Sequence, residues 1–126
     1  MPQLTVNGQT IEVEAGTRLV LAIEAAGIKI GHRCGGNARC TTCRVEFQAG
    51  EPTTMTQAEY AKLKERELLG QVRLACQCVC EQDMSVTPLQ TAETMPQWNG
   101  DTGPAPAPTV TPDPTTYSIE QLKAAA

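Results

Sequence analysis

The chain has 126 residues, a net charge of −4 and only four aromatic side chains, so it has room for one domain with an appendage and its core must be aliphatic. The negative charge and the lack of a basic stripe argue against nucleic-acid binding, and no apolar run is long enough to cross a bilayer. The first residues lack the basic and apolar regions of a signal peptide. We therefore expect a cytoplasmic protein whose cysteines are reduced or metal-bound rather than paired in disulfides.

The start of the chain predicts a β-hairpin followed by a helix. Alternating apolar and polar residues flank Asn7-Gly8, which is the strongest short-range signal for a hairpin. Apolar residues over 19–26 then recur at the spacing of one helix face. Thr17 can cap the start of this helix, and Gly27 can end it.

The middle of the chain predicts a strand, a helix and a last strand. The alternation over 45–47 indicates a short strand, and Thr56 with Glu59 has the pattern of a capping box that opens a helix ending by Gly70. The last strand is expected at about 78–86. The order of hairpin, helix, cysteine-rich loop, strand, helix and strand predicts an α+β domain with a small mixed sheet and a helix packed on it.

The composition changes near residue 90, which predicts a domain over 1–90 and a tail over 91–126. The domain has ten acidic and nine basic residues, whereas the tail has four acidic residues, one basic residue and most of the prolines. This composition predicts an acidic, Pro-rich tail that is extended or disordered. Residues 118–124 can form a short helix because Ser118 and Gln121 make a weak capping box, but such a short helix is marginal in water and disorder is favoured.

The six cysteines fall into two groups, in the segments HRCGGNARCTTC and RLACQCVC. Thiolates bind soft or borderline metals, and the three in the first group need a fourth ligand from the second. Four-thiolate iron–sulfur sites combine clustered cysteines with a distant fourth one. Gly35 and Gly36 allow the backbone to wrap closely and to aim N–H groups at the sulfurs. The cysteines are Cys34, Cys40, Cys43, Cys76, Cys78 and Cys80.

The segments CGGNARCTTCRVEF and RLACQ resemble the [2Fe–2S] ferredoxin family, which has a β-grasp (ubiquitin-like) fold. The resemblance covers roughly residues 2–89. It is nearest to the bacterial kind, which is also a domain of the flavoprotein subunit of sodium-pumping NADH:quinone reductase and of oxygenase reductases. It implies that the cluster ligands are Cys34 and Cys40 at the iron nearer the surface, and Cys43 and Cys76 at the inner iron.

A structural zinc site is the alternative for these cysteines. It could combine Cys40 and Cys43 with Cys76 and Cys78, which are types and spacings that zinc accepts. That arrangement would leave Cys34 unused, and it would not explain the two glycines that follow.

Further residues near the cysteines have two interpretations each. Cys78 and Cys80 are expected on one face of a strand, where thiols behave as small hydrophobes, and a ligand-swap or redox role is the alternative. His32 is expected beside the cluster rather than as a ligand. Three arginines around the loop are either ordinary solvated charges or a rim that docks a partner: Arg33, Arg39 and Arg44.

The resemblance implies a one-electron carrier that shuttles electrons between a reductase and an acceptor oxidoreductase or oxygenase, as a monomer or in transient complexes. Its potential should be low, as in plant-type ferredoxins near roughly −400 mV. No nucleotide-binding glycine motif and no nucleophile–base pair is readable, so the chain alone is not expected to be an enzyme. The alternative is a redox-sensing or scaffolding module that docks through its Pro-rich tail. The balanced charge of the helix after Thr56 weakens electrostatic docking to a basic reductase face.

Overall fold

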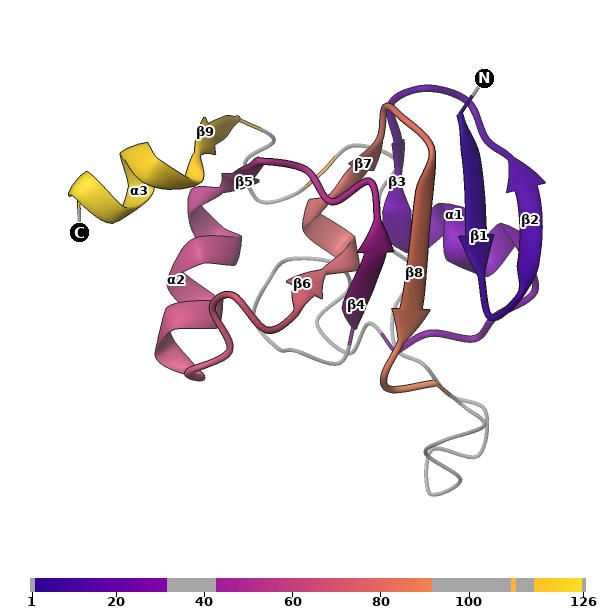
Figure 1. The fold of residues 1–126 in the computed structure, drawn as a ribbon. Helices are drawn as coiled ribbons and strands as arrows, with labels where there is room; N and C mark the ends of the chain where they lie inside the picture. Colours follow the sequence, from indigo (N-terminus) through magenta and orange to yellow (C-terminus); the bar gives the residue numbers. More distant parts are fainter. Residues whose placement is uncertain (1, 32–42, 92–109, 111–114, 126) are drawn as a thin grey trace.

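A five-stranded mixed sheet with strand order β2-β1-β8-β4-β6 forms the centre of the fold, and helix α1 (Leu19–Ala25) covers one of its faces (Figure 1). Strand β8 runs parallel to β1 and antiparallel to β4. The computed structural model describes residues 2–31, 43–91, 110 and 115–125. The strands of the sheet are β1 (Gln3–Val6), β2 (Gln9–Glu12), β4 (Arg44–Ala49), β6 (Arg73–Leu74) and β8 (Met84–Pro88).

The predicted N-terminal hairpin is confirmed. β1 and β2 are antiparallel and are joined by Asn7 and Gly8, whose φ angles of 50° and 82° are those of a type I′ turn. Asparagine and glycine tolerate these positive angles better than other residues do. Leu4 and Val6 consequently face the core, where both are fully buried.

Helix α1 begins differently from the prediction. Thr17 is not its cap, because the hydroxyl of Thr17 donates to the carbonyl of Glu14 at 2.7 Å. Arg18 is the N-cap, and its side chain does not cap the helix N–H groups. The cause is tertiary pairing. Strand β3 (Thr17–Arg18) pairs with β7 (Val79–Cys80) and runs directly into the helix.

The end of α1 follows the prediction. Gly27 has a φ of 89°, its N–H donates to the carbonyl of Glu24 at 2.9 Å, and the N–H of Ile28 donates to Ile23 at 3.3 Å. This pair of hydrogen bonds is the Schellman motif, which requires the left-handed conformation that glycine adopts without strain.

The single strand predicted over 78–86 is wrong. It is two strands, β7 and β8, separated by the polar residues 81–83 and belonging to different sheets. A hydrogen bond from the N–H of Gln3 to the Asp83 carboxylate, at 2.9 Å, holds the connection. Gly50 lies so close that a Cβ there would be 2.1 Å from the Asp83 carbonyl oxygen, so only glycine fits.

Half of the predicted capping box is present at helix α2 (Gln57–Glu65), which follows strand β5 (Thr54–Thr56). The hydroxyl of Thr56 accepts the N–H of Glu59 at 3.1 Å, but the Glu59 carboxylate does not return to Thr56. The helix ends at Glu65, within the predicted limit of Gly70. Glu67 takes a left-handed φ of 59°, and the N–H of Leu68 donates to the carbonyl of Leu63 at 2.8 Å.

The Glu59 carboxylate instead forms a buried ion pair that joins α2 to β6. Its oxygens accept hydrogen bonds from Arg73 Nε at 2.8 Å, Arg73 Nη2 at 3.1 Å and the N–H of Leu74 at 2.9 Å. The same guanidinium donates to the carbonyls of Pro52 and Thr54, both at 2.8 Å. Every oxygen of the buried carboxylate therefore has a partner, as a buried charge requires.

The described end of the tail packs on the domain and contains a short helix close to the possible one at residues 118–124. Strand β9 (Thr116–Ser118) pairs with β5, and helix α3 (Ile119–Ala125) follows it (Figure 1). The weak capping box is fully formed, with reciprocal hydrogen bonds of 3.1 and 3.2 Å between Ser118 and Gln121. A short helix is not stable by itself in water. Packing stabilises this one, because Leu122 is buried against the core.

Most of the Pro-rich part of 91–126 lies outside the described residues, so its extended or disordered state stays a prediction. In the described parts of the chain, no helix is long and apolar enough to cross a membrane. The core is aliphatic, as expected, and its largest fully buried apolar side chains are Leu4, Leu19, Ile23, Ile30, Leu63 and Leu74.

Removing the charge of Glu59 should destabilise the domain. We expect Glu59→Gln to lower the free energy of unfolding by about 3–5 kcal/mol, because it leaves the buried Arg73 charge without its counter-ion. Glu65→Gln, on the same helix, is the matched control and should be nearly neutral, because its ion pair with Lys62 is exposed. Chemical denaturation measures both, and equal effects of the two variants would contradict the assigned role of the buried pair.

Docking of the tail end should depend on Leu122. Leu122→Ala should weaken it by about 2 kcal/mol through lost burial, which corresponds to roughly 30-fold faster amide hydrogen exchange in β9. Glu120→Ala, at an exposed position of the same helix, is the control and should leave the exchange of β9 unchanged within about twofold. Fast exchange of β9 in the unmutated chain would show that the tail end is not docked.

Candidate metal centre

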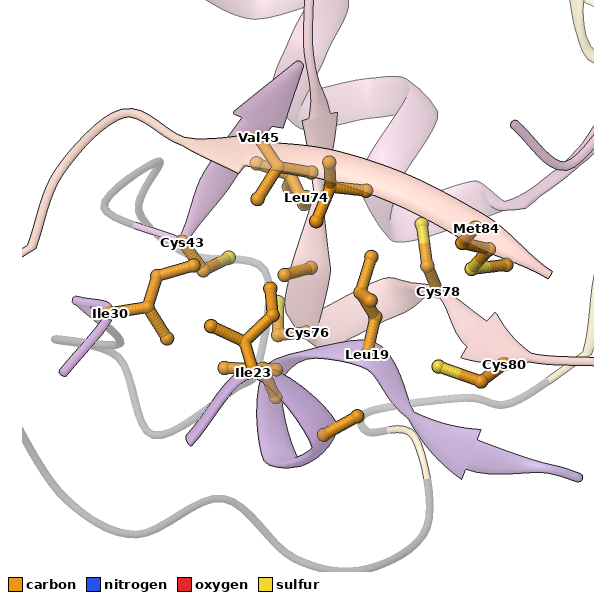
Figure 2. Close-up of a cluster of buried hydrophobic side chains, with 14 of the residues drawn as sticks. Leu19, Ile23, Ile30, Cys43, Val45, Leu74, Cys76, Cys78, Cys80 and Met84 are labelled. Atoms are coloured by element: carbon orange, nitrogen blue, oxygen red, sulfur yellow. The ribbon is translucent and has the colours of Figure 1, made fainter. Parts of the chain in front are cut away.

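Two of the four predicted ligands, Cys43 and Cys76, lie together at one edge of the core. Both are fully buried, and they come from chain segments that are adjacent in the sheet (Figure 2). Arg44 at the start of β4 pairs with Leu74 of β6, and the N–H of Ala75 donates to the carbonyl of Cys43 at 3.0 Å. The antiparallel pairing of β4 and β6 therefore carries the two cysteines to the same place.

The other predicted residues of the cysteine-rich loop lie outside the described residues. This holds for Cys34 and Cys40, and for His32, Arg33 and Arg39. Arg44 is described and is partly buried. The expected docking rim of arginines thus stays a prediction.

A buried arginine that the sequence analysis did not single out holds the backbone at Cys76. Cys76 lies in the short 3-10 helix η1 (Ala75–Gln77). Arg18 is fully buried, and its Nε and Nη2 donate to the carbonyl oxygen of Cys76 at 3.0 and 2.6 Å. Two donors from one rigid guanidinium fix the orientation of this peptide, and with it the position of the cysteine. The only signal in the sequence is an arginine at the start of an apolar run.

The remaining cysteines, Cys78 and Cys80, lie elsewhere in the core. They lie near Met84 and Leu19, away from Cys43 (Figure 2). Burial raises the pKa of the Cys78 thiol, as does the Glu59 carboxylate, and burial raises the pKa of Cys80 to about 11. Both thiols are therefore protonated at neutral pH in this environment. Both are buried and pack as small hydrophobes, but only Cys80 lies in β7, whereas Cys78 is the C-cap of η1, so the predicted common strand face is not formed.

The zinc alternative is not supported by this arrangement. It requires Cys43, Cys76 and Cys78 to converge on one ion, and in the part of the chain that the structure describes no three metal-ligating side chains gather in such a group. None of the four described cysteines is in a disulfide.

The described donor set fits an iron–sulfur cluster. Cys43 and Cys76 supply two adjacent thiolates on backbone segments held by hydrogen bonds, and thiolates are the ligands of such clusters. An amide hydrogen-bond donor also faces the site, because Gln77 Nε2 lies 3.6 Å from Cys76 Sγ. Hydrogen bonds to the ligand sulfurs orient the ligands of such centres and tune the metal.

The mixed sheet, the helix on its face and the two adjacent buried cysteines together define the class of protein. It is a small α+β domain that binds metal through cysteine thiolates. The family model of the 2Fe-2S iron-sulfur cluster binding domain matches residues 4–81, which is more than half of the chain. The chain belongs to this family. The predicted [2Fe–2S] cofactor and the resemblance to ferredoxins are thereby confirmed.

Two curated relatives show what kinds of protein share this domain. A 2Fe-2S ferredoxin from Haemophilus influenzae is 35% identical over 75 residues, which covers 57% of this chain and 66% of that protein. One subunit of the Na(+)-translocating NADH-quinone reductase from Chlamydia pneumoniae is 37% identical over 79 residues, which covers 61% of this chain and 18% of that protein. The matched region is thus about a fifth of the length of such reductase subunits.

Solved structures agree with the predicted β-grasp fold. The ISC-like [2Fe-2S] ferredoxin from Pseudomonas putida has a TM-score of 0.57 and 27% identity, covering 69% of this chain and 91% of that one. The ferredoxin reductase in carbazole 1,9a-dioxygenase has a TM-score of 0.55 and 26% identity, covering 70% of this chain and 29% of that one. The predicted α+β fold class is therefore confirmed.

Serine substitutions should separate the ligand from the core cysteines. Cys76→Ser should abolish the cluster or alter its spectrum grossly. Cys78→Ser and Cys80→Ser should keep the cluster and lose about 1–3 kcal/mol of stability, because each buries a hydroxyl among apolar groups. Visible absorption and iron content measure the first effect, and denaturation the second. Loss of the cluster in Cys78→Ser but not in Cys76→Ser would refute the assignment.

Proposed function

We propose that this chain is a one-electron carrier that holds a [2Fe–2S] cluster through Cys34, Cys40, Cys43 and Cys76. The observation that carries the proposal is the pair of buried cysteines, Cys43 and Cys76, held together by sheet pairing at one edge of the core. When bound, the cluster takes up and gives back a single electron. The surrounding chain provides a fixed frame for that exchange.

Rigidity is what the described residues contribute to electron transfer. Arg18 holds the carbonyl of Cys76, and the ion pair of Glu59 and Arg73 ties β6 to α2 immediately before that cysteine. Side chains held by several buried hydrogen bonds do not rearrange when a nearby charge changes. Such preorganised surroundings respond little to the electron, which favours fast exchange.

The partners we propose are a reductase and an acceptor oxidoreductase or oxygenase. Support comes from the relatives, which include one subunit of an NADH-quinone reductase and the ferredoxin reductase in a dioxygenase system. In those longer proteins the matched region is a minor part of the chain, and we propose that here this domain likewise exchanges electrons with a reductase and an acceptor.

The described end of the tail is used in contacts within the chain, whereas the Pro-rich stretch through which the alternative scaffolding module would dock lies outside the described residues. The described end is paired with β5 and buries Leu122 against the domain.

The test combines cofactor content with repeated turnover. Protein purified under anaerobic conditions should contain two irons and two sulfides per chain and show a rhombic EPR signal on reduction with dithionite. With a ferredoxin reductase and cytochrome c as acceptor, it should pass on many electrons per molecule, and Cys76→Ser should pass on none. Cys80→Ala is the matched control and should retain turnover. A colourless protein with one zinc would overturn the proposal.

A further inference from the structure

We propose that Gln77 tunes the reduction potential of this centre by donating a hydrogen bond to the Cys76 sulfur, and that Thr56 is the positioning residue that aims it. The inference rests on the proposed role of Cys76 as a ligand and extends it to two residues with no assigned role. Gln77 Nε2 lies 3.6 Å from Cys76 Sγ, and both residues are in η1. This is within hydrogen-bond range for a sulfur acceptor.

A chain of hydrogen bonds leads to this contact from helix α2. The N–H of Glu59 donates to the Thr56 hydroxyl oxygen at 3.1 Å, and that hydroxyl donates to Gln77 Oε1 at 2.5 Å. Thr56 and Gln77 are both buried, with exposed fractions of 1% and 3%. The amide is therefore held between two partners and shielded from solvent.

The order of donors and acceptors fixes which way the Gln77 amide points. A thiolate ligand can only accept a hydrogen bond, so the group facing Cys76 must be the NH2 group. The amide oxygen then faces Thr56 and needs a donor. Thr56 can donate its hydroxyl proton because its oxygen already accepts the helix N–H of Glu59. All three contacts are satisfied only in this orientation.

The expected effect on the potential has a definite sign. Reduction adds negative charge to the cluster and its thiolates, and a donor aimed at a sulfur stabilises the more negative state. The stabilisation is larger in a buried site, where water does not screen it. The hydrogen bond from Gln77 therefore raises the potential, and removing it should lower it.

The elements around Thr56 hold its hydroxyl in the position from which it donates to Gln77. Thr56 ends β5 and is the N-cap of α2, so both of its neighbouring elements constrain it. On the other side of β5, Thr56 is opposite Thr116 in the pairing with β9. Thr56 is thus fixed by the sheet pairing of the tail end as well as by the helix.

The first measurement compares midpoint potentials by spectroelectrochemistry. Gln77→Met keeps the length of the side chain and removes the donor, and it should lower the potential. The equilibrium with a fixed one-electron partner should shift about three- to tenfold towards the oxidised cluster, where tenfold corresponds to 59 mV. Gln77→Met with a loaded cluster and an unchanged potential would overturn the inference.

Variants of Thr56 provide a second test if Gln77→Met does not fold. Thr56→Val keeps the shape and removes the hydroxyl, so it should lower the potential, whereas Thr56→Ser restores the hydroxyl and should restore the potential. A merely structural role for Thr56 would change stability without this pattern. An equal potential in the valine and serine variants would refute the positioning role.

A matched control exists on the surface of the sheet. The hydroxyl of Thr87 donates to Gln48 Oε1 at 3.2 Å, an exposed pair of the same two residue types. Gln48→Met and Thr87→Val should leave the potential unchanged. If they shift it as much as the buried variants do, the effect does not come from the contact with Cys76.

Two further readouts separate this inference from the proposed function. Iron and sulfide content, with Cys76→Ser as the reference, shows whether a cluster is present and whether Cys76 holds it; failure there removes the proposed ligand set. With the cluster present, the iron–sulfur stretching bands in resonance Raman spectra should shift on exchange into D2O. The shift should be smaller in Gln77→Met, and an equal shift in both proteins would overturn the role of Gln77 alone.

Discussion

The buried ion pair between Glu59 and Arg73 is the interaction on which the rest of the site depends. A carboxylate and a guanidinium buried together are costly to desolvate, and only their full set of hydrogen bonds makes the arrangement tolerable. Those bonds reach α2, β6 and the segment before β5. The segment at Pro52, helix α2 and strand β6 are thereby held together directly beside the segment that carries Cys76.

Further hydrogen bonds hold the backbone around Cys76, and they explain how so short a segment can be rigid. η1 has only three residues and no stability of its own, but Arg18 holds its carbonyl from the side of α1, and the Cys43 carbonyl accepts the N–H of Ala75 from the side of β4. The hydrogen bond from the Thr56 hydroxyl to Gln77 Oε1 adds a contact from the side of α2. Electron exchange benefits from such a frame, because little around the thiolates has to move.

Much of this could be predicted from local sequence. The Asn7-Gly8 turn and the end of α1 at Gly27 follow from backbone preferences that neighbouring residues do not override. The predictions were wrong where contacts between distant segments determined the local structure. Thr17 does not cap α1, because it pairs with Cys80 between β3 and β7. Glu59 does not complete the capping box, because its carboxylate forms an ion pair with the buried Arg73. The weak capping box at Ser118 formed in full because burial of Leu122 supports α3.

The sequence by itself determined the class of the domain and the cofactor, because the spacing of cysteines and glycines that resembles the family is a local property of the chain. Only the tertiary structure decided how Cys76 is held and which polar groups face it. No sequence pattern assigned Arg18, Thr56 or Gln77 to the site, and each matters there through a partner that is 21 to 58 residues away or through a neighbour that such a partner orients. Hydrogen bonds of this kind exist only after the chain has folded and excluded water from them.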